Sequence, residues 1–326
     1  MSDSVDWGLA ASTGRRVAPD GPKVSPAQAA DAVQQLTELA AEAVDHVRER
    51  TELVADPAVN RTAVVDRPQW IQSNIDGFRL ALTPMLERVQ EQSGPAAKPL
   101  ADAGAKVSGM QMGAILGYLS GKVLGQYEAF VPPGEPGRLL LVAPNIVGAE
   151  RSLELDSRDF RLWVCLHEET HRVQFGAVPW LSEYFTAEVN EFLLAADLSP
   201  ADAARRLITL LREVSRIVLG DREASIVEAA QTPDQRVIFG RLSALMSLLE
   251  GHAEFVMDDV GPDVLPTVAH LRERFEHRRS VSAAGGEGLL RRLLGMDAKM
   301  RQYANGREFV STVVDRVGLD GFNAVW

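Results

Sequence analysis

The chain has 326 residues, enough to bury a substantial hydrophobic core. Its 46% hydrophobic and 24% charged residues are usual for a soluble globular protein and exclude a chain that is disordered throughout. Its net charge of -11 argues against broad binding to nucleic-acid backbones.

The first elements of the chain are predicted from their capping residues. Residues 1–24 are rich in Gly, Ser, Pro and charge, so we expect an irregular arm that docks through Trp7. They contain no uninterrupted apolar core like that of a secretory signal, which favours the cytoplasm. Ser25-Pro26-Ala27-Gln28 predicts a helix to about Val54. The same pattern at Asp66-Arg67-Pro68-Gln69 predicts a second helix, ending near Gln92.

Glycines then recur every four residues in an apolar stretch, at Gly109, Gly113, Gly117, Gly121 and Gly125. Each glycine weakens a helix by roughly 1 kcal/mol relative to alanine, so tight packing along a smooth ridge must offset the cost. That packing is either internal or between subunits of a homo-oligomer. A membrane span is not expected, because polar residues interrupt the apolar run, namely Lys106, Gln111, Ser120 and Lys122.

The remaining pattern predicts a mainly α fold with a small β element. Residues 132–137 break the helical pattern, and 138–142 form the clearest strand candidate. Helices are expected near residues 156–176, 180–197, 200–218, 233–259, 264–279, 289–303 and 307–317, with a small-residue loop at 280–288. We divide the chain into the arm 1–24, a helical region 25–130 and a metal-binding region 131–326, the last two closely packed as one unit.

The most informative motif is His167-Glu168-Glu169-Thr170-His171. A preceding N-cap, Asp156, and an apolar run place it inside a helix, where both imidazoles share one face and can bind one metal ion. Glu168 then lies beside a metal-bound water as a candidate general base. The alternative is a surface helix with a chance histidine pair. The single Cys165 lies in the apolar run and is expected to be a buried thiol rather than a nucleophile.

A catalytic zinc site needs a third protein ligand and an open position. Glu250, Glu254 and Asp258 are spaced by four on one helical face, among apolar neighbours. We assign Glu250 as the third ligand and Glu254 as an acceptor that orients a histidine ligand. A solvated acidic face is the alternative for Glu250. Two other candidate ligands are His252, about 200° around the helix from Glu250, and Glu183, which ranks below Glu250.

Three segments together resemble a largely actinobacterial family of zincin-like metalloproteases, zincin type 2, some of whose members are labelled as associated with deazaflavin coenzyme biosynthesis. They are residues 167–175, 178–181 and 249–254. The resemblance runs from the glycine-rich helix to the terminal Trp326. It implies a zincin-like fold, one zinc ion and hydrolase chemistry, with His167 and His171 as ligands and Glu168 as the base. It also supports Glu250.

The leading hypothesis is therefore a zinc metallopeptidase that hydrolyses a peptide or related amide. Candidate donors to the oxyanion are His252, Tyr184 and Tyr303. One alternative is a hydrolase of a non-peptide amide or ester that uses the same ion. The other is a non-catalytic, zinc-stabilised helical protein that binds a partner or senses a ligand, with four protein ligands closing the zinc site.

Overall fold

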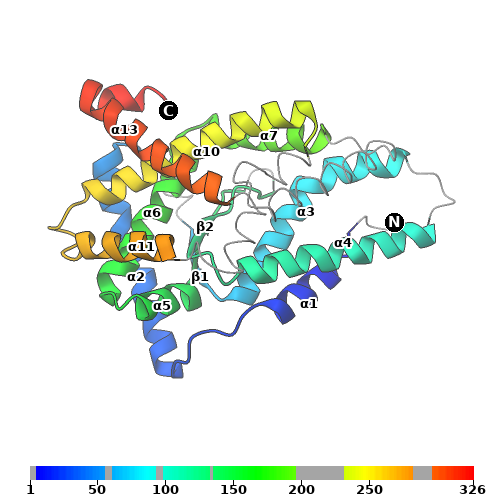
Figure 1. The fold of residues 1–326 in the computed structure, drawn as a ribbon, viewed down its shortest axis with the longest axis horizontal. Coiled ribbons are helices and arrows are strands. Elements are labelled where there is room, and N and C mark those ends of the chain that lie inside the picture. The colour runs from blue at the N-terminus through cyan, green and yellow to red at the C-terminus, as the bar shows by residue number, and fades with distance from the viewer. Residues whose placement is uncertain (1–4, 56–60, 93–97, 133–134, 196–230, 282–295) are drawn as a thin grey trace. The chain divides into compact units, whose positions relative to one another are not determined.

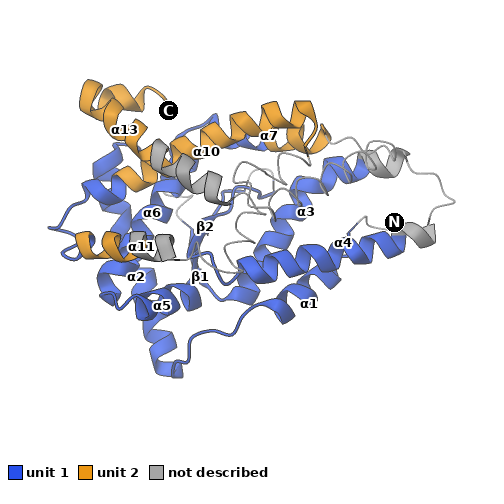
Figure 2. Ribbon diagram, viewed as in Figure 1, with its two compact units in different colours: residues 1–186, 256–268 blue, residues 187–255, 269–326 orange. Residues whose placement is uncertain are grey.

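The computed structural model describes residues 5–55, 61–92, 98–132, 135–195, 231–281 and 296–326 (Figure 1). The chain divides into two compact units (Figure 2). Unit 1 comprises Met1–Thr186 and Val256–Val268, and unit 2 comprises Ala187–Phe255 and Ala269–Trp326. Helices dominate both, and the described strands form one small sheet, so the predicted mainly α class is confirmed. None of the described helices combines the length and apolar character needed to cross a membrane.

Among the described residues, unit 1 holds the sheet and six whole helices. The helices are α1 (Trp7–Val17), α2 (Pro26–Thr51), α3 (Arg67–Gln92), α4 (Lys98–Leu119), α5 (Ala143–Ser152) and α6 (Ser157–Ala177). The strands are β1 (Thr62–Val65), β2 (Gly125–Tyr127) and β3 (Leu139–Val142). Helix α7 (Leu181–Leu194) starts in unit 1 and continues in unit 2. Most of α10 (Pro233–Asp259) and α11 (Val268–Val281) and all of α13 (Met296–Asn323) belong to unit 2.

The sheet has the strand order β1-β3-β2. The central strand, β3, is fully buried and confirms the strand predicted at 138–142. It pairs in parallel with β1 and antiparallel with β2, so that Leu140 lies opposite both Ala63 and Gln126. Neither outer strand is predicted from the sequence, because each is too short to show an alternating pattern. Helix α6 packs on β2 and β3 and against α2, which places it in the core of unit 1.

The predicted capping boxes at the starts of α2 and α3 are confirmed. At α2, the Ser25 side chain accepts from the Gln28 backbone N–H, and the Gln28 side chain accepts from the Ser25 N–H. Asp66 and Gln69 make the same reciprocal pair at α3. These four hydrogen bonds satisfy amides that the first turn of a helix leaves without partners, so local sequence alone fixes where both helices begin.

The prediction of an irregular arm over residues 1–24 is wrong, because Trp7–Val17 form α1. The Asp6 side chain accepts from the Leu9 backbone N–H and caps this helix. Trp7 packs against the adjacent apolar cluster, as expected, and Ala10 is fully buried. Tertiary packing against α4 therefore stabilises a short helix that would be marginal alone.

The glycine ridge of α4 is the surface that receives α1. A Cβ built on Gly109 or Gly113 would lie 2.4 Å from a backbone oxygen of α1 or its cap, Asp6 O and Ala10 O respectively. A Cβ on Gly117 would lie 2.7 Å from Gly14 O. The two backbones thus touch directly, and the ridge packs within one chain.

The ridge prediction fails for Gly121 and Gly125, which follow the end of α4. Directly after the end of the helix, the Ser120 carbonyl accepts a hydrogen bond of 2.7 Å from the Asn145 side-chain amide. Gly121 lies beyond the helix, against Pro19, and Gly125 begins β2. The four-residue spacing therefore continues in the sequence after the helix has ended.

The predicted helices at 180–197, 233–259 and 264–279 correspond to α7, α10 and α11. The helix predicted at 200–218 and most of the loop predicted at 280–288 lie outside the described residues. Helix is confirmed at 296–303 and 307–317, but the predicted break between the two helices is wrong, because α13 runs through 304–306. Its non-helical residue is Gly318, with φ 74°. Gly306 stays helical because it packs closely against α10 at Gly251.

We expect Gly113→Ala to lower the free energy of unfolding by about 1–3 kcal/mol, because its methyl group forces α1 and α4 apart. The matched control is Gly104→Ala in the same helix, where a Cβ meets nothing within 4 Å. Alanine should be neutral there or stabilising by up to about 1 kcal/mol. Urea unfolding of both variants tests the ridge, and equal stabilities would show that α1 does not rest on these glycines.

Candidate metal centre

Helix α6 begins at a well-formed cap and runs through the interior of unit 1. The Asp156 side chain accepts a hydrogen bond of 2.9 Å from the Asp159 backbone N–H. Leu162, Cys165 and Leu166 are fully buried. Burial raises the pKa of the Cys165 thiol well above its usual range, and the negative charges of three glutamates raise it further. Cys165 is therefore a buried, unreactive thiol, as its apolar sequence neighbourhood predicts.

His167 and His171 point toward each other on one half-buried face of α6. Their Nε2 atoms are 3.2 Å apart, and the ring planes are nearly perpendicular, at 89°. Zinc binds imidazole nitrogen at about 2.0–2.1 Å in tetrahedral geometry, which separates two ligand nitrogens by about 3.3–3.4 Å. The chemistry and spacing of these donors therefore fit two corners of a zinc site, as the motif predicts.

The other ring nitrogen of each histidine contacts a buried side chain. His171 Nδ1 is 2.9 Å from Oε1 of Gln174, and His167 Nδ1 is 3.1 Å from Sδ of Met257. Gln174 is fully buried and Met257 almost so. Neither residue is predicted from the sequence to belong to the site. The only signal for Gln174 is its place one turn after His171, and Met257 is far away in the sequence.

Glu168 lies between α6 and β2, and only 7% of it is exposed. A Cβ built on Gly125 would lie 2.5 Å from the Glu168 carboxyl carbon, so any larger residue there would displace this carboxylate. Two turns further on, Phe175 stacks on Tyr127 of β2 with ring centroids 5.3 Å apart. The strand thus follows the face of α6 that carries Glu168 and Phe175.

Glu169 points away from this carboxylate and forms a buried ion pair with Arg172. Arg172 Nε donates to Glu169 Oε2 at 2.7 Å, and Nη2 donates to the other carboxylate oxygen. Only 1% of Glu169 and 3% of Arg172 is exposed. Burial raises the pKa of Glu169, and the guanidinium opposes that shift. These contacts give Glu169 a structural role in the core of unit 1.

The remaining predicted residues occupy several helices. Glu250 and Glu254 lie half-buried in the part of α10 that belongs to unit 2. His252 is fully buried there, and its ring lies 5.3 Å from the rings of both Phe322 and Trp326. This enclosure by aromatic side chains favours a core role for His252 over metal binding.

Two more predicted residues are exposed on α7. Glu183 is exposed, and 38% of Tyr184 is accessible. Tyr303 lies in α13, and its side chain is outside the described part of the chain. The roles predicted for Glu250, Glu254, Glu183, Tyr184 and Tyr303 stay predictions.

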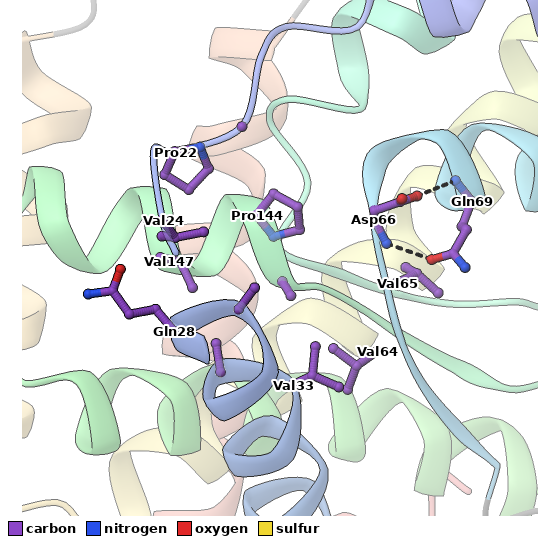
Figure 3. A pocket seen from close by; sticks show the side chains of 14 residues that line it. Pro22, Val24, Gln28, Val33, Val64, Val65, Asp66, Gln69, Pro144 and Val147 are labelled. Atoms are coloured by element: carbon purple, nitrogen blue, oxygen red, sulfur yellow. Dashed lines mark hydrogen bonds between the residues drawn. The ribbon is translucent and has the colours of Figure 1, made fainter. Parts of the chain in front are cut away.

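A separate cavity of about 300 Å³ opens where β1 and β3 end (Figure 3). Its walls are mainly apolar, with Val64 from β1, Val33 from α2 and Val147 from α5. The acidic residue in its lining, Asp66, accepts from the Gln69 backbone in the capping box of α3. The cavity contains neither the histidine pair nor Glu168, so it offers no comparable set of catalytic groups.

Comparisons with known proteins agree with this chemistry. The model of the zincin-like metallopeptidase family matches residues 5–326, and the chain therefore belongs to that family. It also resembles the crystal structure of "a putative hydrolase with a novel fold" from Chloroflexus aurantiacus, with 29% sequence identity and a TM-score of 0.65. That match covers 96% of this chain and 88% of the other. No curated protein matches the chain. The chain is thus assigned to a family of metal-dependent hydrolases.

We expect the buried Glu169–Arg172 ion pair to contribute to the free energy of unfolding. Arg172→Met should cost about 3–5 kcal/mol at pH 7, because it leaves a buried carboxylate unpaired. The double variant Glu169→Gln, Arg172→Met should recover part of this loss.

The cost of Arg172→Met should also depend on pH. Without the guanidinium, burial holds the folded-state pKa of Glu169 further above its unfolded value. A raised carboxyl pKa makes stability fall as the pH rises, so the deficit should shrink toward pH 5. Urea unfolding at several pH values measures this, and a small, pH-independent deficit would contradict the role given to the pair.

Proposed function

We propose that this member of the zincin-like metallopeptidase family is a zinc-dependent hydrolase that cleaves peptide bonds. The observation that carries the proposal is the 3.2 Å separation of His167 Nε2 and His171 Nε2 on one face of α6, with Glu168 next in the sequence. The family supports the hydrolase class, and peptide specificity is the finer part of the proposal. Both rings are half-buried, so a substrate can reach them while α6 keeps them fixed.

The proposed ligands are the two histidines and Glu250. Glu250 precedes Met257 by seven residues in α10, so the two lie within about 20° on the same helical face. Met257 contacts His167 through its thioether, which supports choosing this face of α10 for the third ligand. Glu250 follows the fully buried Leu249 and precedes the buried Gly251, and a half-buried carboxylate in such surroundings favours a cationic partner.

When bound, zinc supplies Lewis-acid chemistry, because it polarises a carbonyl and makes water acidic enough to ionise near neutral pH. Glu168 takes a proton from the attacking water as the new carbon–oxygen bond forms. It then gives this proton to the leaving amine nitrogen as the carbon–nitrogen bond breaks. Gly125 and the neighbouring part of β2 leave room for the carboxylate and restrict its position, which suits a base that acts twice in one turnover.

The test of the proposed base is Glu168→Gln. This variant should keep stoichiometric zinc and lose peptide hydrolysis by at least about 100-fold, because the amide cannot accept the proton. The matched control is Glu38→Gln, on the exposed face of α2, which should retain wild-type zinc and activity. Metal analysis and a peptide-library digest give the two readouts.

Full activity of Glu168→Gln would remove it as the base. A wild-type protein that leaves peptides intact but hydrolyses small amides or esters would overturn peptide specificity and keep the hydrolase. A protein that holds zinc and acts on neither class would support the non-catalytic alternative.

The third ligand is tested by zinc affinity. Glu250→Gln should weaken zinc binding by more than about 100-fold, exceeding the usual effect of residues that only orient a ligand. Glu183→Gln should leave the affinity unchanged, because Glu183 is exposed on α7. Competition with a chromophoric chelator measures both constants, and the opposite ranking would move the third ligand to Glu183.

A further inference from the structure

We propose that Gln174 is a positioning residue that fixes the proton of His171 on Nδ1 and thereby prepares Nε2 for the metal ion, with Met257 as a weaker counterpart for His167. This inference rests on the proposed zinc site and deepens it. It assigns roles to two buried side chains that the predicted ligand set does not include.

The amide of Gln174 determines which ring nitrogen of His171 carries the proton. The group that contacts His171 Nδ1 at 2.9 Å is the carbonyl oxygen Oε1, which can only accept a hydrogen bond. With the amide in this orientation, the hydrogen bond places the proton on Nδ1. A neutral imidazole has one N–H, so Nε2 keeps its lone pair, which is the form that binds a metal ion.

The position of Gln174 makes this hydrogen bond persistent. Gln174 lies three residues after His171 in the same helix and is fully buried, so water does not compete for the contact. The backbone of α6 fixes both residues, and the hydrogen bond needs no loop to order. Gln174 thus limits both the rotation of the His171 ring and the transfer of its proton to Nε2.

Met257 makes the corresponding contact with His167, but a thioether is a weak hydrogen-bond acceptor. The hold on His167 is therefore weaker than the hold on His171. When both rings carry their protons on Nδ1, two lone pairs face each other across 3.2 Å and repel. Buried partners that keep the rings in place prevent them from turning away, and a cation between the nitrogens removes the repulsion. The contacts therefore favour a site that is arranged before zinc arrives.

The first test compares zinc affinities by chelator competition. Gln174→Leu should weaken zinc binding by about 10–100-fold, as for other residues that orient ligands, whereas Gln174→Glu keeps an acceptor and should largely restore it. Met257→Leu should change the affinity by less than about 10-fold. The matched control is Thr170→Val, which also removes a buried hydrogen bond from α6, to Leu166 O, and should leave the affinity unchanged.

The second test uses the metal-free protein. Nitrogen-15 NMR of the histidine rings should show the Nδ1–H form for His171 in the wild type and in Thr170→Val, and a shift toward Nε2–H in Gln174→Leu. A wild-type His171 in the Nε2–H form, or wild-type zinc affinity in Gln174→Leu, would overturn the inference. Failure of the wild type to bind zinc would overturn the proposed function instead, while the spectrum of the metal-free protein still decides whether Gln174 places the proton.

Discussion

Two imidazole nitrogens held 3.2 Å apart on one turn of a buried helix are the constraint on which the rest of the candidate site depends. The four-residue spacing brings the rings to one face, and the neighbouring side chains turn their Nε2 atoms toward each other. The helix must also keep its shape, because a distortion of about an ångström would destroy the geometry that a zinc ion requires. Packing against α2, β2 and β3 supplies this rigidity.

Burying such a polar helix has an electrostatic cost that the surrounding contacts offset. The Arg161 guanidinium makes two hydrogen bonds to Glu150, at 2.9 and 2.7 Å, near the start of α6. Directly after the second histidine, Arg172 neutralises Glu169. A buried charge without a partner would cost several kcal/mol, so these ion pairs allow the helix to lie in the core. The site is therefore stabilised by polar contacts on both sides of the histidine pair.

Local signals in the sequence predict those parts of the structure that depend on neighbouring residues. They include the histidine pair, the Asp156 cap, and the capping boxes at Ser25 and Asp66. Features that depend on distant contacts are missed, since Met257 is 90 residues from His167 and no periodicity connects them.

The glycines show what regular spacing in a sequence can predict and what it cannot. The spacing of Gly109, Gly113 and Gly117 correctly predicts close helix packing, but the same spacing continues to Gly125, where a strand has begun. What Gly125 accommodates is the carboxylate of Glu168, a relation that exists only after the chain has folded. The irregular arm is misjudged for a similar reason, because α1 needs the surface of α4.

Because the Cys165 thiol is enclosed, we expect the native chain to resist alkylating and fluorescent maleimide reagents. It is the one cysteine of the sequence and is fully buried beside the metal-binding motif. A cysteine engineered on the surface would therefore accept a probe selectively, without first removing the natural one. Conversely, labelling of Cys165 itself would report when α6 separates from its neighbours, a direct chemical signal of the integrity of the helix that carries the histidines.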